Sequence, residues 1–365
     1  MARLELKNLT KGFKTGPVFN DVSLSVEAGE IVVVFGPSGT GKTVLLRIVA
    51  GVQDADAGTV VIDGEDVTEA PPEQRDVGMA FQNFALFPHM SAFDNIASPL
   101  AARHAAADKL KQGVASIAQL LKIEHVLGHA PRELSNGQKQ RTALARALVA
   151  APKVLLLDDP LRNVDAKLRY EMRLELPRLL KSFDAAVLYV TQDYKEAMAL
   201  ADRIAVLRDG RIEQWSEPAT IYREPVSIGV ARLFGDPTIN LLPCRIDGSN
   251  GRATIGLFGR AVGLAETGAT PGRACIAGLR PEHVVVHTDN PPGAIPFDLD
   301  AVMPVNVRSV LYLRGPQGEE LLATVGESAA SRFGRGHRKV WVTFEAEDIL
   351  LFDAASGARV AAPAS

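Results

Sequence analysis

Apolar positions in the first part of the chain change from strand spacing to helical spacing. Up to about residue 85 they form short β-type runs, which Gly, Asp and Asn turns separate. These runs are Leu4/Leu6, Val22–Val26, Ile31–Phe35 and Val60–Ile62. From Phe93 to about Ala150 the spacing becomes helical, as at Leu110, Val114 and Ile117. We therefore expect a strand-rich segment followed by a helical subdomain inserted at about 86–150.

Strand character returns after the helical segment. Apolar runs occupy 154–157, 186–190 and 204–207, and a helix-compatible stretch, 166–183, lies between the first two. Strands that alternate with helices favour a parallel sheet covered by helices. The pattern predicts an α/β core with a parallel sheet and an antiparallel N-terminal sheet. Residues 1–7 alternate polar and apolar positions, which is typical of an edge strand.

A third pattern begins after Gly235-Asp236-Pro237. Pro and Gly become frequent there, and short strands recur at 274–277, 305–310 and 340–344. Such a sequence is typical of a small β-barrel or sandwich. We predict two domains, an α/β domain at 1–235 and an all-β domain at 236–365.

Composition narrows the possible partners and compartments. The 365 residues are 47% apolar, and 40 basic and 43 acidic residues give a net charge of −3 without a basic block, so no nucleic-acid partner is expected. No apolar stretch reaches the ~20 residues that cross a bilayer, and the N-terminus lacks the apolar core of a signal peptide. The two cysteines, Cys244 and Cys275, are expected to be plain core residues in a reducing compartment, and the histidines lack zinc-site spacing.

The strongest chemical motif is a phosphate-binding loop. Eight residues match Gly-x-x-x-x-Gly-Lys-Thr between an apolar run and a helical one: Gly36, Pro37, Ser38, Gly39, Thr40, Gly41, Lys42 and Thr43. Glycines let backbone N–H groups point at a triphosphate, and the following helix adds the positive end of its dipole. Lys42 is then expected to neutralise the β- and γ-phosphates, and Thr43 to hold Mg²⁺. The alternative is an ordinary Gly/Ser-rich turn.

Two further segments fit a nucleotide site less specifically. The run 154–157 ends in Asp158, which would place a carboxylate beside the Mg²⁺ at the carboxyl end of a sheet. Before the helical run 142–150 stand Ser135, Asn136, Gly137 and Gln138. Ser135 and Gln138 fit a helix capping box, and the same helix start fits an anion site, so both interpretations remain open.

Residues 134–141, Leu-Ser-Asn-Gly-Gln-Lys-Gln-Arg, resemble the signature Leu-Ser-Gly-Gly-Gln of the ATP-binding cassette (ABC) family. The resemblance covers about 235 residues. It implies that the signature of one subunit covers the γ-phosphate of ATP held by another, so that ATP joins two subunits. It also implies that Phe13 stacks on adenine, unless it is a core residue. Gln82 would contact Mg²⁺ and begin the segment 83–94 that meets membrane subunits, and the loop 161–165, which ends at Asp165, would cross the dimer interface.

The C-terminal part has a narrower resemblance. Segments 234–240, 278–283 and 344–353 are similar to the C-terminal domain of carbohydrate-importer ATPases, which serve maltodextrins, glycerol phosphate, glycerol and other polyols. This implies a barrel of the oligonucleotide/oligosaccharide-binding (OB) type for dimer contact and regulation. It also implies peripheral attachment to transmembrane permease subunits at the cytoplasmic face of the inner membrane, with an extracytoplasmic solute-binding protein as an indirect partner.

Two residues depart from the family pattern. Asp159 stands where the family has the glutamate that polarises the attacking water, and Gln192 stands where it has a histidine. Asp is one methylene shorter than Glu, and Gln cannot become cationic. We therefore expect Asp159 and Gln192 to form a weak hydrolytic site in a heterodimer with a second, different ATPase subunit. The alternatives are a slower homodimer, a non-transport clamp of the same family, or a binding protein without useful turnover.

Overall fold

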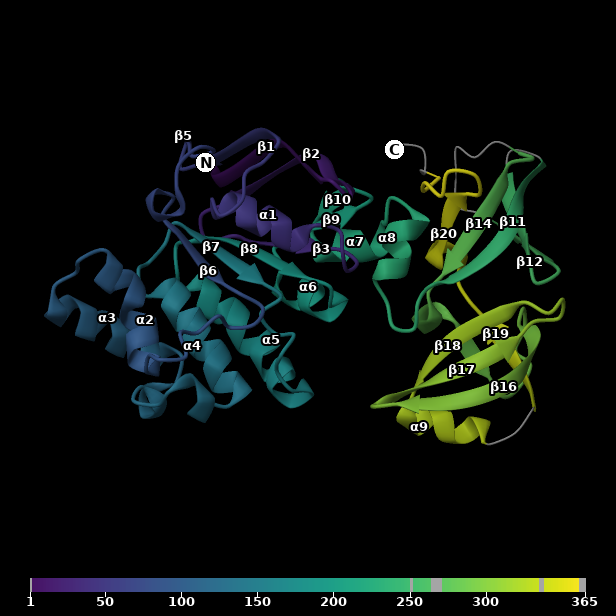
Figure 1. Cartoon of the computed structure of the whole chain (residues 1–365). Helices are drawn as coiled ribbons and strands as arrows, with labels where there is room; N and C mark the ends of the chain where they lie inside the picture. Colours follow the sequence, from purple (N-terminus) through teal and green to yellow (C-terminus); the bar gives the residue numbers. More distant parts are fainter. Residues whose placement is uncertain (1, 250–251, 264–270, 335–337, 361–365) are drawn as a thin grey trace. The chain divides into compact units, whose positions relative to one another are not determined.

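The computed structural model describes residues 2–249, 252–263, 271–334 and 338–360 (Figure 1). They form two compact units that meet between Ile221 and Tyr222. The sequence predicts the boundary after residue 235. Between these two points lies α8 (Ile228–Leu233), whose Ala231 belongs to one apolar cluster with Phe352 of the C-terminal unit.

The N-terminal unit is built on a six-stranded sheet with the order β10-β9-β3-β8-β7-β6. Its strands are β3 (Ile31–Phe35), β6 (Val77–Ala80), β7 (Val154–Asp158), β8 (Ala186–Thr191), β9 (Arg203–Arg208) and β10 (Arg211–Ser216). All pairs are parallel except β9 with β10. Every residue of β3, β7 and β8 is buried, which explains why these strands read as continuous apolar runs. The predicted parallel α/β core is confirmed.

A second, antiparallel sheet has the order β2-β1-β4-β5. Its strands are β1 (Ala2–Phe13), β2 (Gly16–Glu27), β4 (Ala57–Ile62) and β5 (Glu65–Asp66). The edge-strand prediction for residues 1–7 is wrong, because β1 pairs with both β2 and β4; Met1 itself lies outside the described residues. Alternation shows that one face of a strand is buried, and it cannot tell an edge from a central strand.

One apolar core joins the two sheets through α1 (Lys42–Val49). Leu45 and Leu46 of this helix share a cluster with Leu6 of β1 and with Leu156 and Leu188 of the parallel sheet. The helix that follows the phosphate-binding loop is therefore held from both sides.

The helical subdomain contains α2 (Ala92–Ala102), α3 (Ala107–Leu120) and α4 (Asn136–Leu148), which Figure 1 shows gathered into one group. α2 starts at a capping box in which the Ser91 hydroxyl accepts the Asp94 N–H at 3.1 Å. Three further helices come after the helical subdomain along the chain: α5 (Ala166–Lys181), α6 (Tyr194–Leu200) and α7 (Pro218–Arg223). None of the helices in the described ranges is long and apolar enough to cross a membrane.

The C-terminal unit consists of two five-stranded antiparallel sheets, ordered β13-β12-β11-β14-β20 and β15-β19-β16-β17-β18. The first contains β11 (Asn240–Ser249), β12 (Arg252–Leu257), β13 (Arg260–Gly263), β14 (Ala274–Leu279) and β20 (Ile349–Asp353). The second contains β15 (Val285–His287), β16 (Ile295–Val305), β17 (Arg308–Arg314), β18 (Glu320–Gly326) and β19 (Arg338–Thr343), and α9 (Glu327–Ala330) follows β18. Both contribute to one core, in which Ile246 and Leu279 share a cluster with Phe297 and Val342. The expected all-β, barrel-like domain is confirmed.

Candidate nucleotide site

The phosphate-binding loop runs from the end of β3 to the start of α1, as the motif predicts. Gly39 and Gly41 have φ of 85° and 91°, in the left-handed region that favours glycine. A Cβ on Gly41 would lie 2.2 Å from Val18 Cγ1, and one on Gly36 would lie 2.3 Å from the carbonyl oxygen of Leu207. Glycine is therefore required at 36 and 41 by lack of space, and at 39 by its φ.

Lys42 lies with its ammonium group inside this loop. Its Nζ donates hydrogen bonds of 2.7 Å each to the carbonyl oxygens of Gly36 and Pro37. Burial lowers the pKa of Lys42, and the nearby carboxylates of Asp159 and Asp158 oppose that shift. The only full positive charge of the loop is thus held where a phosphate would meet the backbone N–H groups.

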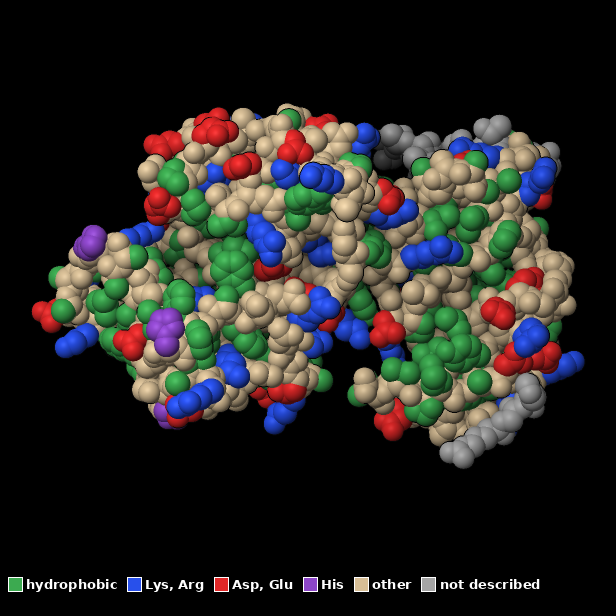
Figure 2. Space-filling view, in the orientation of Figure 1, with side chains coloured by type: hydrophobic (Ala, Val, Ile, Leu, Met, Phe, Trp, Pro, Cys, Tyr) green, Lys and Arg blue, Asp and Glu red, His purple; other side chains and the backbone are tan. Residues whose placement is uncertain are grey.

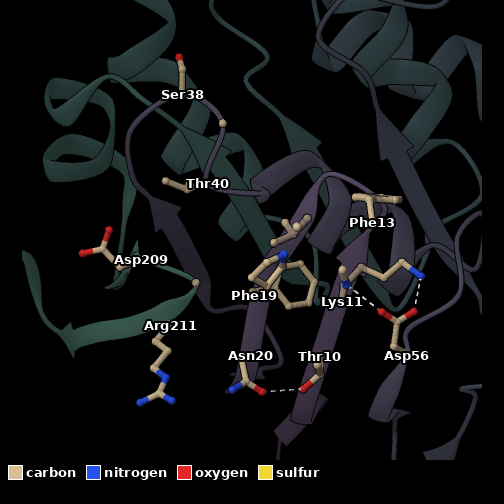
Figure 3. A pocket seen from close by; sticks show the side chains of 16 residues that line it. Thr10, Lys11, Phe13, Phe19, Asn20, Ser38, Thr40, Asp56, Asp209 and Arg211 are labelled. Carbon is tan, nitrogen blue, oxygen red and sulfur yellow. Dashed lines mark hydrogen bonds and ion pairs between the residues drawn. The ribbon is translucent and has the colours of Figure 1, made fainter.

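Two adjoining cavities open beside the loop. One, of about 420 Å³, brings together ten of the predicted residues, namely Phe13, Ser38, Gly39, Gly41, Lys42, Thr43, Gln82, Asp158, Asp159 and Gln192. The other, of about 1200 Å³, shares Phe13, Val18, Ser38 and Gly39 with the first and extends between β1, β2 and the β9–β10 turn (Figure 3). The pair offers a phosphate compartment next to a wider one for a nucleoside.

Phe13 borders both cavities at the end of β1, and its side chain is 49% exposed, so it is not a core residue. Figure 3 shows it beside Lys11, whose Nζ lies 5.6 Å from the centre of the ring. Lys11 pairs with Asp56 at 2.6 Å, and Asp56 also accepts the Gly12 N–H at 2.7 Å. Sequence reasoning missed Lys11 and Asp56, which hold the backbone that presents this flat apolar ring.

The predicted magnesium ligands lie together. The Thr43 hydroxyl donates to Asp158 Oδ1 at 2.9 Å, and Gln82 lines the same cavity. Burial raises the pKa of Asp158, and the hydrogen bond from Thr43 opposes this. Hydroxyl, carboxylate and amide oxygens suit Mg²⁺, which takes its remaining ligands from phosphates and water. Within the described ranges no group of three or more His, Cys, Asp or Glu residues could hold a metal ion.

Asp159 and Gln192 reach the phosphate compartment from neighbouring strands. Asp159 follows β7 with φ of 44°, a left-handed conformation that Asp adopts more readily than most residues. Its Oδ1 accepts from the Thr191 hydroxyl at 3.3 Å, and its Oδ2 lies 3.7 Å from Arg162, which the sequence did not mark as a contact. Burial raises the pKa of Asp159, and Arg162 opposes the shift. Gln192 follows β8 and accepts a hydrogen bond from the Ser38 hydroxyl of the loop.

The signature residues lie elsewhere in the chain. Ser135 and Gln138 form the capping box of α4, with the Gln138 N–H donating to Ser135 Oγ at 3.3 Å and the Ser135 N–H to Gln138 Oε1 at 2.8 Å. Asp165 caps α5 by accepting the Leu168 N–H at 3.0 Å. Asn136 and Gly137 start α4, and none of these five residues lines either cavity. A single chain therefore does not bring them to its own phosphate loop.

A buried acid behind the site escaped sequence reasoning altogether. Glu196 on α6 is 1% exposed and accepts from the Tyr189 hydroxyl at 2.7 Å. Burial raises its pKa to about 7, although the hydrogen bonds from Tyr189 and Thr191 lower it. An acid in a short helix looks like a surface residue in sequence, because only its contacts with β8 show that it points inward.

Comparisons with known proteins agree with this geometry. A family model described as ABC transporter matches residues 19–162. The uncharacterized ABC transporter ATP-binding protein YurJ of Bacillus subtilis is 42% identical over 298 residues, which are 80% of this chain and 81% of that protein. The sn-glycerol-3-phosphate import ATP-binding protein UgpC of Chromobacterium violaceum is 38% identical, with 99% of this chain and 96% of that protein covered.

Two further relatives extend the likeness. The lactose transport ATP-binding protein LacK of Rhizobium radiobacter is 36% identical, with 99% of this chain and 100% of that protein covered. The dimeric ATP-binding cassette MJ0796, solved in a post-hydrolysis state with ADP and Pi, superposes with a TM-score of 0.54 at 30% identity. That match covers 59% of this chain and 98% of the cassette.

We predict that Lys42→Ala weakens Mg-ATP binding by about 10- to 150-fold, because it removes a charge-assisted phosphate contact worth ~1.5–3 kcal/mol. Titration of the purified chain with a fluorescent ATP analogue measures the affinity. Lys109→Ala, on the exposed surface of α3, is the matched loss of a lysine and should leave the affinity unchanged. Equal affinities for wild type and Lys42→Ala would contradict the assigned site.

The raised pKa of Glu196 predicts a pH-dependent stability. Because the folded state binds this proton more tightly than the unfolded chain, the stabilisation is complete below the unfolded pKa of 4.5 and is lost as pH rises through about 7. Denaturant unfolding should show wild type losing roughly 2–3 kcal/mol relative to Glu196→Gln between about pH 5 and pH 8.

Glu175→Gln is the control for that measurement, since its hydrogen bond to Lys122 lowers rather than raises the pKa of Glu175. Wild type should not lose stability relative to Glu175→Gln as pH rises. A constant difference between wild type and Glu196→Gln across this range would show that Glu196 ionises normally in the folded protein.

Proposed function

The chain belongs to the family of ABC transporter ATP-binding proteins, and on that premise we propose that it is the ATP-hydrolysing subunit of an importer for a sugar, a polyol or a polyol phosphate. Relatives that match 99% of the chain are named for sn-glycerol 3-phosphate and for lactose. The C-terminal all-β unit, which these relatives cover, would serve dimer contact and regulation. The solute itself would be selected by the membrane and solute-binding subunits.

The observation that carries this proposal is the convergence of Lys42, Thr43, Gln82 and Asp158 on one cavity beside Phe13. Lys42 and the loop N–H groups would bind the phosphates, and Phe13 would stack on the adenine. Thr43, Gln82 and Asp158 would hold Mg²⁺, which when bound neutralises charge that develops on the phosphates. Asp159 would orient the attacking water, and Gln192 would hydrogen-bond the γ-phosphate.

Dimerisation is supported by the position of the signature residues and of Asp165 in the single chain. Ser135, Asn136, Gly137, Gln138 and Asp165 lie outside both cavities, so a role in nucleotide binding requires that they act on the ATP of a second subunit. The start of α4 suits this role, because a helix N-terminus attracts a phosphate. The capping box and the anion site are then compatible, since the box fixes the end of the helix that faces the partner.

A groove in the N-terminal unit supports docking of permease subunits at the cytoplasmic membrane face. This cavity of about 680 Å³ lies between β6 and the helical subdomain, and its lining includes Phe81, Phe87 and Met90 from the segment that follows the sheet. Phe87 is 42% exposed. Arg146 of α4 holds the segment by donating to the carbonyl oxygens of Ala85 at 2.7 Å and Phe84 at 3.1 Å.

Charge and fold give little support to a nucleic-acid clamp. Figure 2 shows basic and acidic side chains interspersed over the face drawn, without a large basic area. The two relatives named above for specific solutes are transport proteins and match the chain over nearly its whole length.

The departures at Asp159 and Gln192 favour a hydrolytically weak site paired with a second, different ATPase subunit. The Asp159 carboxylate is drawn toward Thr191 and Arg162, and a shorter side chain stands back from the phosphate compartment. A misplacement of ~1 Å can cost of order a hundredfold in rate. The second candidate is a homodimer in which Asp159 works at a lower rate. The cassette MJ0796, a related chain, is dimeric in its solved structure.

We expect the double change Asp159→Glu with Gln192→His to raise the ATPase rate of the purified chain. The longer carboxylate and the titratable imidazole act as a unit, so either change alone should do less. Steady-state phosphate release measures the rate. A double variant no faster than wild type would count against the weak-site interpretation.

Asp159→Asn separates the two dimer models. In a complex with a second ATPase, Asp159→Asn should matter little, whereas changing the corresponding glutamate of that partner should abolish turnover. Loss of turnover with Asp159→Asn would instead establish a working site here, and the heterodimer proposal would be wrong.

The domain division also makes a prediction. Arg211 is the last residue along the chain that lines either cavity, so a fragment of residues 1–235 should bind Mg-ATP as tightly as the full chain. Titration of both proteins, with Lys42→Ala in each as the site control, measures this. A folded fragment that does not bind ATP would show that the C-terminal unit contributes to the site.

A further inference from the structure

Four side chains behind the hydrolytic site form one buried hydrogen-bonded chain. Tyr189 and Thr191 are alternate residues of β8, so they lie on the same face of the sheet, and both are 0% exposed. Glu196 Oε2 lies 2.7 Å from the Tyr189 hydroxyl and 3.1 Å from Thr191 Oγ1. Thr191 Oγ1 in turn lies 3.3 Å from Asp159 Oδ1. The chain links an acid on α6 to the residue placed beside the attacking water.

The Thr191 hydroxyl can donate its hydrogen to either end of this hydrogen-bonded network. Its hydroxyl oxygen already accepts the Asp193 N–H at 3.0 Å, and it carries a single hydrogen. Two carboxyl oxygens, on Glu196 and Asp159, lie within hydrogen-bond distance of that hydrogen. Only one of them can receive a well-directed hydrogen bond at a time.

We propose that Glu196 is a positioning residue for hydrolysis, which competes with Asp159 for the Thr191 hydroxyl proton. This inference rests on the proposed role of Asp159. When Glu196 is neutral, its own proton can be donated to Thr191 Oγ1, and Thr191 donates to Asp159 Oδ1. When Glu196 is ionised, Thr191 donates to Glu196, and Asp159 Oδ1 is left to accept a hydrogen of the attacking water.

The surroundings place this change near neutral pH. Burial raises the pKa of Glu196 to about 7, the Tyr189 hydrogen bond opposes this, and the negative charges of Asp193 and Asp159 add to it. The helix α6 packs on α5, β3 and β8. From α5, Arg173 pairs with Asp193 at 3.0 Å, while β3 contributes only apolar residues. Arg162, on the loop after β7, pairs with Asp159.

The direct test is the carboxyl ¹³C resonance of Asp159 in the full chain labelled at aspartate, assigned by its loss in Asp159→Asn. Besides the shift that the ionisation of Asp159 itself causes, this resonance should show a step near pH 7 in wild type. In Thr191→Val the step near pH 7 should vanish although Glu196 is still present. Thr191→Ser keeps the hydroxyl, so this variant should show the step as wild type does. If the step persists in Thr191→Val, the coupling is purely through space and the proposal is wrong.

Tyr189→Phe is the matched control within the same chain of contacts. It removes the other hydrogen bond to Glu196 but leaves the contact between Thr191 and Asp159. Since the Tyr189 hydrogen bond lowers the pKa of Glu196, the step should move to higher pH and keep its size. A Tyr189→Phe variant that abolishes the step would indicate general loosening of the site.

Turnover gives the second readout, measured as hydrolysis by the full chain alone. Glu196→Gln should lower kcat by roughly three- to tenfold above pH 7, the effect of one hydrogen bond, with KM unchanged and the pH step absent. In a Thr191→Val background the same change should have no further effect, whereas independent structural damage would add. Additive effects would overturn the proposal.

The proposed roles of Asp159 and Glu196 can be tested separately. If Asp159→Asn leaves hydrolysis by the full chain unchanged, the proposed role of Asp159 is wrong, and the resonance still tests the competition for the proton. If Asp159→Asn abolishes hydrolysis but the resonance shows no step in wild type, only the role of Glu196 is wrong. Thermal unfolding shows whether each variant is folded. If Glu196→Gln does not fold, the comparison of Thr191→Ser with Thr191→Val in the resonance experiment still tests the proposal.

Discussion

The parallel pairing of β3, β8 and β7 is the constraint on which the site depends. In this register Phe35 lies opposite Thr191, and Asp158 lies opposite Val190. Three chain segments far apart in sequence therefore end at one edge of the sheet, and each continues directly into functional residues. The loop follows β3, Asp159 follows β7 and Gln192 follows β8. A shift of one residue between these strands would move every side chain to the opposite face of the sheet and offset the strand ends, so the pairing of the buried strands fixes the site as well as the core.

Sequence patterns predicted the parts of this arrangement that have local causes. The loop could be found because its motif occupies eight consecutive residues, and the φ that requires glycine at 39 is set within the loop. The lack of space at 36 and 41 comes from Leu207 and Val18, which no local pattern reveals. Continuous apolar runs predicted the parallel strands because both sheet faces are covered. Features set by tertiary contacts were missed, such as the central place of β1, the pairing of Lys11 with Asp56, and the burial of Glu196. The place of the signature residues relative to a second subunit likewise depends on contacts that no single chain contains.

Charges of opposite sign lie together in the phosphate compartment. Lys42 and Arg162 face Asp158 and Asp159, and burial shifts the pKa of Lys42 downward and those of both aspartates upward. Asp159 is the largely buried member of an ion pair with Arg162, so removing Arg162 would leave its carboxylate without that partner. A nucleotide with Mg²⁺ adds further charges of both signs to this compartment, so the protein groups can stay paired while the ligand binds. The shortened carboxylate at 159 belongs to this balance, since it reaches both Thr191 and Arg162.

The phosphate compartment and the groove proposed for permease docking are linked by a short stretch after β6. Asn163, in the loop assigned to the dimer interface, donates to the carbonyl oxygen of Gln82 at 2.7 Å. Phe84 and Ala85 follow with φ of 64° and 48°, a conformation that costs of order 1–3 kcal/mol for each such residue. Arg146 offsets that cost by binding both of their carbonyl oxygens. One segment, which begins at Gln82, thus contacts the loop 161–165 through Asn163 and the helical subdomain through Arg146. These contacts connect Gln82, which lines the phosphate compartment, with Phe84 and Ala85, and Ala85 lines the groove proposed for permease docking.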